Sequence, residues 1–227
     1  MLIAGFEKNT LLDYPGKIAS IIFTYGCNLK CPYCHNPELV IHPCQKENLY
    51  SEDYILDYLK HREGLIDALV ITGGEPTLQS DLIPFIKRVK ELGILVKLDT
   101  NGILDDIVED IIKQDIVDYW AMDIKYPTEY FNEYGLDSKS IEKSIEMIMN
   151  SGKEYEFRTT YVKGIHSIED AKSIGKMIKG AKNYYIQNFR KGKTINPKLN
   201  ESNSFTEKEL EEIKKVISPY VKKVKIR

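Results

Sequence analysis

Three of the four cysteines in the sequence lie within eight residues, in the stretch CNLKCPYC. At this spacing the thiolates of Cys27, Cys31 and Cys34 can converge on one metal centre from a single loop. A structural zinc site normally takes four ligands, and a closed iron–sulfur cluster takes four cysteines. The stretch therefore predicts a metal centre that either takes a fourth ligand from elsewhere in the chain or keeps one metal position open.

Zinc is the plain alternative for this loop. The fourth zinc ligand would then be His35, His42 or Cys44. Because His35 adjoins Cys34, it is a poor candidate, since neighbouring side chains rarely turn to one metal together. A second zinc arrangement would use Cys31, Cys34, His42 and Cys44. That arrangement leaves Cys27 without a role, and in the three-cysteine interpretation Cys44 is a small residue without one.

Charge and hydropathy narrow the classes of protein. The net charge of −2 gives no sign of a nucleic-acid surface. No run approaches the ~20 apolar residues of a membrane span, and the first residues do not resemble a signal peptide. We therefore expect a cytoplasmic protein without membrane or nucleic-acid partners, whose clustered thiols are metal ligands in a reducing compartment.

Short apolar runs alternate with helical patterns along the chain. The strands are expected at 18–23, 67–72, 94–99, 118–124, 156–162 and 184–189. The helices are expected at 52–62, 79–92, 104–113, 138–150, 168–179 and 207–217. Alternation of this kind predicts an α/β fold with a parallel sheet. Six βα units fall short of the eight of a closed barrel, so we expect a partial (β/α)6 TIM-like barrel forming one domain over 1–227.

Polar and glycine-bearing motifs stand at or near the ends of these strands. They are GGEPT (73–77), DTNG (99–102), DIK (123–125), FRTT (157–160) and QNF (187–189). Parallel α/β folds build their active sites at the carboxyl ends of the strands. The motifs are therefore expected to surround one site, and the segment 190–205 is expected to be a surface loop over one rim.

These motifs resemble those of a known family, the radical S-adenosylmethionine enzymes. CNLKCPYC resembles the family's three-cysteine loop, with the aromatic Tyr33 before the third cysteine, and GGEP (73–76) resembles its second motif. The resemblance continues through LDTNG (98–102), MDIK (122–125) and FRTT (157–160). The lead-in LLDYPGKIASIIFTYGC and the tetrapeptide YCHN are most similar to glycyl-radical-enzyme activases. Among these they resemble the activases of anaerobic ribonucleoside-triphosphate reductase most, with pyruvate formate-lyase activase nearby.

The resemblance gives the odd number of cysteines a reason. It implies that Cys27, Cys31 and Cys34 hold three irons of one 4Fe–4S cluster. The methionine amino and carboxylate groups of S-adenosylmethionine would chelate the fourth iron. An electron passed to the sulfonium would yield methionine and a 5′-deoxyadenosyl radical, which abstracts a hydrogen atom from the substrate. The implied partners are a glycyl radical enzyme, chiefly anaerobic ribonucleoside-triphosphate reductase, and a one-electron donor such as flavodoxin or ferredoxin.

The resemblance also assigns individual residues. Gly73 and Gly74 would let backbone approach the ligand, Glu75 would hold the loop or the methionine ammonium, and Pro76 would stiffen the turn. Asp123 and Lys125 would contact the ribose and the methionine carboxylate. Arg158 would add a second cation for that carboxylate, or else form a salt bridge. The other residues expected to bind the cofactor are Tyr33, Cys34, His35, Asn101 and Asn188, with Lys125 and the three cysteines taken as catalytic.

The resemblance further implies a monovalent cation beside the ligand. Its site would comprise Asp99, Thr100, Asp123 and the carbonyl of Ala121. A plain hydrogen-bond network among these residues is the alternative.

The sequence departs from the family pattern after the sixth strand. Formate-lyase-type activases carry a histidine there, whereas this chain offers only Gln187 or Asn188, and His166 is expected to be structural. Two other functions stay open at this point. One is a small-molecule radical enzyme such as a 7-carboxy-7-deazaguanine synthase, and the other is a non-catalytic zinc or electron-transfer module.

Overall fold

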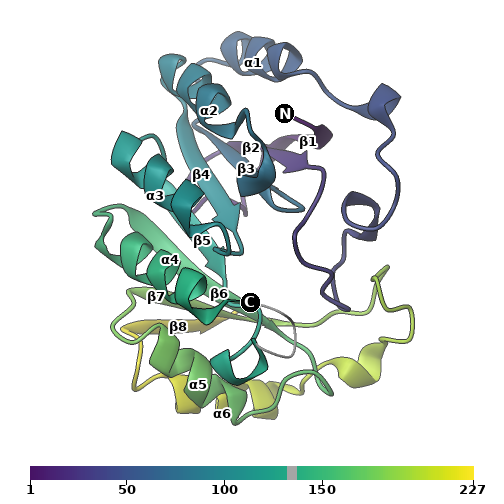
Figure 1. Ribbon diagram of the computed structural model, residues 1–227, viewed down its shortest axis with the longest axis vertical. Coiled ribbons are helices and arrows are strands. Elements are labelled where there is room, and N and C mark those ends of the chain that lie inside the picture. The colour runs from purple at the N-terminus through teal and green to yellow at the C-terminus, as the bar shows by residue number, and fades with distance from the viewer. Residues whose placement is uncertain (132–136) are drawn as a thin grey trace. The chain divides into compact units, whose positions relative to one another are not determined.

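The computed structural model describes residues 1–131 and 137–227 (Figure 1). The strands follow the chain in hydrogen-bonded order from β1 to β8. Their bounds are β1 Ile3–Thr10, β2 Ala19–Thr24, β3 Ala68–Gly73, β4 Leu95–Thr100, β5 Tyr119–Asp123, β6 Glu154–Tyr161, β7 Asn183–Asn188 and β8 Lys223–Ile226. Strand β1 is antiparallel to β2, whereas β2–β3, β3–β4, β6–β7 and β7–β8 are parallel pairs. This order is the one expected of repeated βα units.

Each predicted helix is present. The bounds are α1 Glu52–His61, α2 Leu82–Glu91, α3 Asp105–Gln114, α4 Ser138–Asn150, α5 Asp170–Met177 and α6 Glu207–Ile217. Short 3-10 helices lie at η1 Pro37–Leu39, η2 Lys46–Asn48, η3 Pro76–Leu78, η4 Thr128–Tyr130 and η5 Glu201–Asn203. Helix α2 begins three residues later than predicted, because η3 and the turn after it occupy 76–81. Thr206 and Glu209 cap α6 reciprocally, as a capping box does.

The prediction of six strands missed two. Strands β1 and β8 are the end strands in the hydrogen-bonded order, and both are partly exposed. The sequence IAGFEKNT of β1 mixes glycine with charged residues, and KVKI of β8 has only four residues. An end strand needs little apolar sequence because one of its edges has no neighbouring strand, so neither run gives a strong strand pattern.

Contacts divide the described residues into two compact units, and the single domain over 1–227 stays a prediction. The first unit comprises Met1–Lys30, Asn36–Thr100 and Asp106–Trp120. Its core is formed by apolar residues of the central strands, such as Ile22, Ile71 and Leu98, which are fully buried. Helices α1 and α2 turn buried apolar faces inward and are charged on their outer faces.

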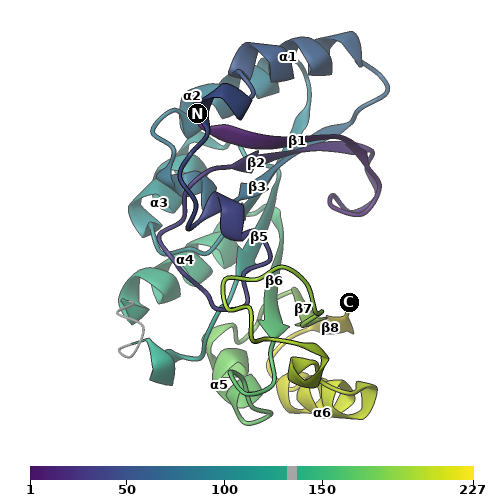
Figure 2. The same cartoon turned by 90° about the vertical axis from the view of Figure 1, so that its right-hand side faces the viewer.

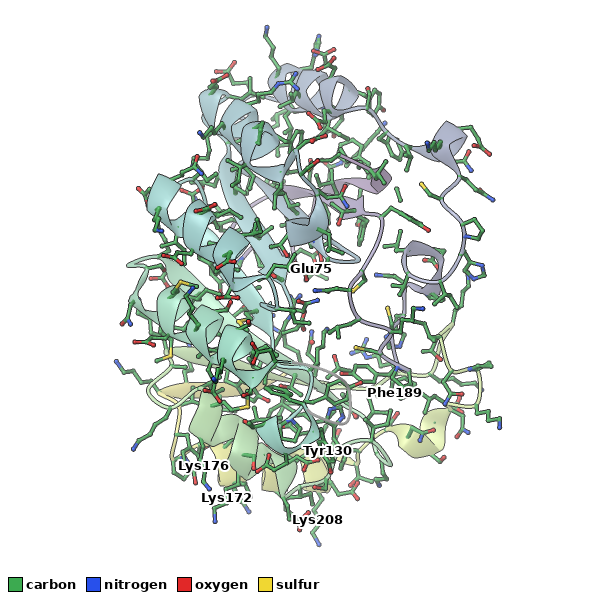
Figure 3. The ribbon with its side chains drawn as sticks, in the orientation of Figure 1. Glu75, Tyr130, Lys172, Lys176, Phe189 and Lys208 are labelled. Carbon is green, nitrogen blue, oxygen red and sulfur yellow. The ribbon has the colours of Figure 1, made fainter. Side chains whose placement is uncertain are left out.

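The second unit comprises Cys31–His35, Asn101–Asp105 and Ala121–Arg227. Its core contains the large aromatic side chains Phe157, Tyr161 and Tyr184. Helices α5 and α6 lie side by side in both views (Figures 1 and 2). The exposed lysines of these helices include Lys172, Lys176 and Lys208 (Figure 3).

Among the described residues, no helix has both the length and the apolar character that crossing a membrane would require.

Candidate active site

The GGEP motif at the end of β3 packs backbone to backbone on the segment that leads into Cys27. A Cβ at Gly73 would lie 2.2 Å from the backbone nitrogen of Thr24, and Gly73 has a φ of +126°. A Cβ at Gly74 would lie 2.0 Å from the carbonyl oxygen of Gly26. The Glu75 N–H donates to that same carbonyl at 2.7 Å. Both positions therefore require glycine, because the GGEP loop lies against the backbone of Thr24 and Gly26. Contact of the two glycines with a ligand stays a prediction.

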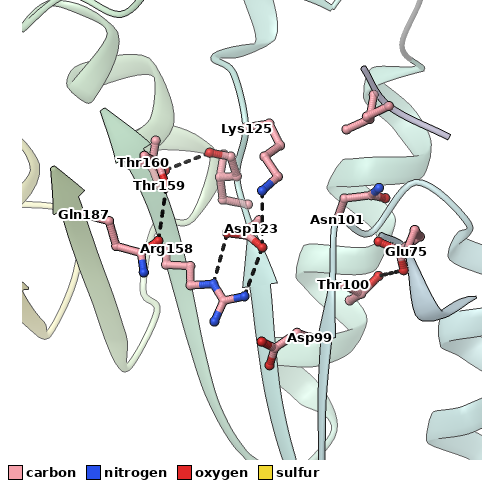
Figure 4. Close-up of polar contacts among 12 residues, drawn as sticks. Glu75, Asp99, Thr100, Asn101, Asp123, Lys125, Arg158, Thr159, Thr160 and Gln187 are labelled. Atoms are coloured by element: carbon pink, nitrogen blue, oxygen red, sulfur yellow. Dashed lines mark hydrogen bonds and ion pairs between the residues drawn. The ribbon is translucent and has the colours of Figure 1, made fainter. Parts of the chain in front are cut away.

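Glu75 organises the loop that it belongs to. Its side chain is buried, and Oε1 accepts bonds from the Thr77 N–H at 3.2 Å and the Thr77 hydroxyl at 2.7 Å. The Thr100 hydroxyl donates to the same oxygen at 2.8 Å (Figure 4). Pro76 occupies the first turn of η3, where its fixed φ suits a helix start. Of the two roles expected for Glu75, the structure displays that of holding the loop.

The predicted cation ligands of β4 already have partners. Asp99 Oδ1 lies 2.5 Å from Lys97 Nζ, and the Lys97 side chain is only 3% exposed. The two residues are two positions apart on a strand, so their side chains share one face. Thr100 donates its hydroxyl to Glu75. Lys97 stands outside the sequence motifs, although a lysine inside the apolar run LVKLD is a visible signal.

Asp123 lies between two cations at the end of β5. Arg158 donates Nε to Oδ1 at 3.0 Å and Nη2 to Oδ2 at 3.1 Å, and Lys125 Nζ lies 3.4 Å from Oδ2 (Figure 4). Burial alone would raise the pKa of Asp123, but the charges of Arg158 and then Lys125 outweigh it and hold that pKa well below its ordinary value. The trio therefore carries one net positive charge. Such a trio is suited to receive an anionic group.

Arg158 thus takes the salt-bridge role that was the alternative in the sequence analysis. It also lies near the buried carboxylate of Glu156, at 4.0 Å, and Arg227 pairs with both oxygens of Glu156 at 3.0 and 3.2 Å. The contact of Arg158 with a ligand carboxylate stays a prediction.

Part of the cysteine loop belongs to the same unit as this trio. Cys31 is buried, and its carbonyl accepts the Cys34 N–H at 3.0 Å. Burial raises the pKa of the Cys31 thiol, and the positive charge of Lys125 acts in the opposite direction. The hydroxyl of Tyr33 donates to the Lys125 carbonyl at 3.2 Å. The aromatic residue of the motif therefore joins the thiol loop to the end of β5.

His35 contacts the segment that follows β7. Its Nε2 lies 2.7 Å from the carbonyl oxygen of Arg190, and its ring stacks on Phe189 with centroids 5.5 Å apart. The Asn196 N–H donates to the Pro32 carbonyl at 2.8 Å. The segment 190–205, predicted to be a surface loop, is a loop apart from η5 and packs on Cys31–His35.

Two predicted ligand residues use their amides to hold backbone. Asn188 donates Nδ2 to the Phe205 carbonyl at 2.8 Å and accepts the Phe205 N–H at 2.9 Å. Asn101 accepts the Ile103 N–H at 3.1 Å and is buried. Gln187, the other candidate for the missing histidine, accepts the Thr160 hydroxyl at 3.3 Å.

The thiols are available as ligands. No disulfide joins any of the four cysteines, all of which lie in the described residues. Within these residues no group of three or more His, Cys, Asp or Glu side chains is gathered as it would be around a metal ion. Binding of a metal requires the thiols to lose their protons.

A family model described as the Radical SAM superfamily matches residues 21–178. The chain therefore belongs to the radical S-adenosylmethionine superfamily, and the resemblance stated above is confirmed. A "Putative glycyl-radical enzyme activating enzyme" of Methanocaldococcus jannaschii is 35% identical over 100% of this chain and 95% of its own length. The pyruvate formate-lyase-activating enzyme of Clostridium pasteurianum is 30% identical over 80% of this chain and 77% of its own length.

Solved structures share the fold. SuiB of Streptococcus suis bound to S-adenosylmethionine superposes with a TM-score of 0.67 at 17% identity, covering 91% of this chain. This chain spans 51% of the SuiB chain. A domain of the pyruvate-formate lyase-activating enzyme from Bacteroides vulgatus gives a TM-score of 0.56 at 16% identity, covering 70% of this chain and 98% of that one. The predicted fold class, an α/β partial barrel, is confirmed.

Membership of the superfamily implies a 4Fe–4S cluster and S-adenosylmethionine, and the donor set fits them. Three thiols on one loop are soft ligands of the kind that iron–sulfur clusters take. The cationic trio of Asp123, Lys125 and Arg158 is suited to a carboxylate such as that of methionine. The chain is an enzyme of the radical S-adenosylmethionine type.

Proposed function

We propose that this chain is an activase that installs a glycyl radical on a partner enzyme. The observation that carries the proposal is the similarity to the M. jannaschii relative, which extends over the whole of this chain. The similarity to the C. pasteurianum enzyme supports the same class.

We assign cofactor binding to two groups of residues. One is the thiol loop, residues 27–34, and the other is the trio of Asp123, Lys125 and Arg158. We assign the cluster to Cys27, Cys31 and Cys34. When bound, the cluster and S-adenosylmethionine supply the electron and the carbon radical for the reaction. Lys125 attracts the methionine carboxylate, while Asp123 keeps the two cations of the trio in place and accepts a bond from the ribose. This assignment is supported by the net positive charge of the trio.

The remaining predicted residues act within their own segments of the chain. We assign Glu75 and Pro76 to holding the loop in which Gly73 and Gly74 expose their backbone carbonyls to the methionine ammonium. We assign Tyr33, His35, Asn101 and Asn188 to holding backbone segments of the second unit, a role supported by their hydrogen bonds.

The region of the expected monovalent cation already holds a lysine ammonium. A cation bound between Asp99 and Thr100 would compete with the Lys97 ammonium, which is 2.5 Å from Asp99. We therefore propose that Lys97 supplies the positive charge in this region, and that an added cation has little effect on the native chain.

The partner and the electron donor follow from sequence resemblance. The tetrapeptide YCHN and the lead-in LLDYPGK favour anaerobic ribonucleoside-triphosphate reductase as the partner. Flavodoxin or ferredoxin is the proposed reductant. We place the reaction in the cytosol, because cysteine ligands of a cluster need reducing surroundings to stay free of disulfides.

The test is reconstitution under anaerobic conditions. The protein should take up about four irons and four sulfides, and Cys27→Ala, Cys31→Ala or Cys34→Ala should abolish this, whereas Cys44→Ala should not. With S-adenosylmethionine, reductant and the cognate reductase, electron paramagnetic resonance should detect a glycyl radical that a Gly→Ala partner lacks. Stoichiometric consumption of a purine-like small molecule without a protein radical would make it a small-molecule radical enzyme. One tight zinc and no iron would make it a zinc protein.

A further inference from the structure

His166 is a buried histidine, 4% exposed, that lies between the end of β6 and the start of α5. The Val162 N–H donates to its Nδ1 at 3.1 Å. Its Nε2 lies 2.9 Å from the carbonyl oxygen of Lys125. Because Nδ1 is an acceptor, the ring proton is on Nε2, and Nε2–H donates to the Lys125 carbonyl.

The ring of His166 is held on its sides by aromatic residues. The ring centroids of Tyr33, Tyr126 and Tyr161 lie 5.7, 5.8 and 5.6 Å from that of His166. The Tyr126 ring is nearly parallel to the imidazole, at 19°, and the other two are strongly tilted. Burial lowers the pKa of His166 and favours the neutral ring that this hydrogen-bond pattern requires. The imidazole therefore has one orientation and one tautomer available.

The Lys125 carbonyl receives two donors from different parts of the chain. One is His166 Nε2–H, and the other is the hydroxyl of Tyr33, at 3.2 Å. Tyr33 lies between Cys31 and Cys34 in the thiol loop. The backbone of the preceding residue, Ile124, is held by β6, since its N–H donates to the Arg158 carbonyl and its carbonyl accepts the Thr159 hydroxyl, both at 2.8 Å.

This arrangement has a consequence for the Lys125 ammonium. The side chain of a lysine is flexible, so the place of its ammonium depends on where its backbone is held. Lys125 follows the last residue of β5 by two positions, beyond the hydrogen-bonded strand. Its carbonyl is fixed by a histidine that contacts the thiol loop through the Tyr33 ring.

We propose that His166 is a positioning residue for the binding of S-adenosylmethionine. It holds the Lys125 backbone and the thiol loop in place against each other. The inference rests on the proposed role of Lys125 in binding the methionine carboxylate. The competing explanation is local: His166 closes the turn 162–166 through Val162, whose carbonyl also accepts the His166 N–H at 2.7 Å.

Two substitutions separate these explanations, because each keeps the hydrogen bond of one imidazole nitrogen and removes that of the other. In His166→Gln the amide nitrogen reaches the place of Nε2 and can still donate to Lys125, but the Val162 N–H loses its acceptor. In His166→Asn the shorter amide reaches only the place of Nδ1, so it keeps the bond to Val162 and loses the bond to Lys125. The exposed His61, on α1, provides the control His61→Asn.

The measurement is the Kd for S-adenosylmethionine on the reconstituted protein, with the Tm of each variant recorded. His166→Asn should raise the Kd about 5- to 10-fold, the effect of one lost hydrogen bond. His166→Gln should stay within about two-fold of the native Kd, and His61→Asn should match the native protein. Equal values of Kd for the Asn and Gln variants, or a weaker Gln variant, would overturn the inference in favour of the local role.

Two further measurements cover the remaining cases. If His166→Asn does not fold, Tyr33→Phe removes the other donor to the Lys125 carbonyl and should raise the Kd several-fold; an unchanged Kd overturns the inference. In the metal-free native protein, nitrogen-15 magnetic resonance of the imidazole should show the Nε2–H tautomer, and the Nδ1–H tautomer would overturn it. None of these readouts uses the partner enzyme. A failure to form a glycyl radical would therefore refute the proposed function and leave the order of the two variants intact.

Discussion

The substitution Gly74→Ala tests the contact between the GGEP loop and the residues before Cys27. The added Cβ would lie 2.0 Å from the carbonyl oxygen of Gly26 and 2.6 Å from its carbonyl carbon. Both partners are backbone atoms, so no side-chain rotation can relieve the collision. A carbon and an oxygen in weak contact stand about 3.3 Å apart or more, so the two segments would have to separate by more than about 1 Å.

That separation would break a hydrogen bond as well as the packing. The Glu75 N–H donates to the same Gly26 carbonyl at 2.7 Å. Overpacking costs about 1–3 kcal/mol, and the lost hydrogen bond adds about 1 kcal/mol. A total of about 2–4 kcal/mol corresponds to a fall in Tm of about 4–16 °C for a chain of this size. Because Gly26 precedes Cys27, the variant should also take up less iron on reconstitution.

The matched control is Gly93→Ala. Gly93 has a φ of +73°, and a Cβ there would have nothing within 4 Å. The substitution therefore introduces backbone strain of about 1–2 kcal/mol without a collision. The measurements are the Tm of both variants and the iron that each takes up on reconstitution. A Gly74→Ala variant that melts no lower than Gly93→Ala, and binds iron as the native protein does, would refute the close approach of Gly74 to Gly26.

Three further substitutions test the charged groups. Lys125→Ala should raise the Kd for S-adenosylmethionine by about 30-fold or more without loss of iron, since a desolvated charged contact is worth ~2–5 kcal/mol. Lys97→Met should lower the free energy of unfolding by about 1.5–3 kcal/mol, because it removes the buried ammonium that pairs with Asp99, and added potassium should restore stability in this variant more than in the native chain. The pKa of Asp123 is depressed in the folded state, so the stability it contributes is present above its unfolded pKa of about 3.9 and lost as the pH falls below that. Asp123→Asn should therefore flatten the acid limb of the stability curve, and an unchanged limb in denaturant titrations would contradict the ion pair.

The sequence was sufficient for the elements that combine an apolar pattern with a terminal signal. The six central strands are short runs rich in apolar residues, and helix α6 begins at the capping box of Thr206 and Glu209. Ser167 and Asp170 form a second reciprocal pair of hydrogen bonds, but α5 begins only at Asp170. Local hydrogen bonds of this kind are readable because both partners lie within one turn.

Contacts between distant residues were not predictable. The bond from His166 to Lys125 spans 41 positions, and that from Thr100 to Glu75 spans 25. A sequence motif names Glu75 and Lys125 but not what holds them. The same limit explains why Arg158 was expected to meet a ligand, when the structure pairs it with the carboxylate of Asp123. The motifs predicted which side chains form the site. Only the structure shows which other residues hold those side chains in place.

The odd number of cysteines and the excess positive charge of the trio are connected under the proposed function. An open iron position needs an external chelate, and a chelating amino acid brings a carboxylate. Two cations alone would repel each other near that carboxylate, whereas Asp123 lies 3.0 Å from Arg158 and 3.4 Å from Lys125 and so holds both. Since one carboxylate offsets only one of the two charges, the trio stays attractive to an anion. Replacing Arg158 by Gln would make Asp123 cancel Lys125, so affinity for the cofactor should fall even if Arg158 never touches it.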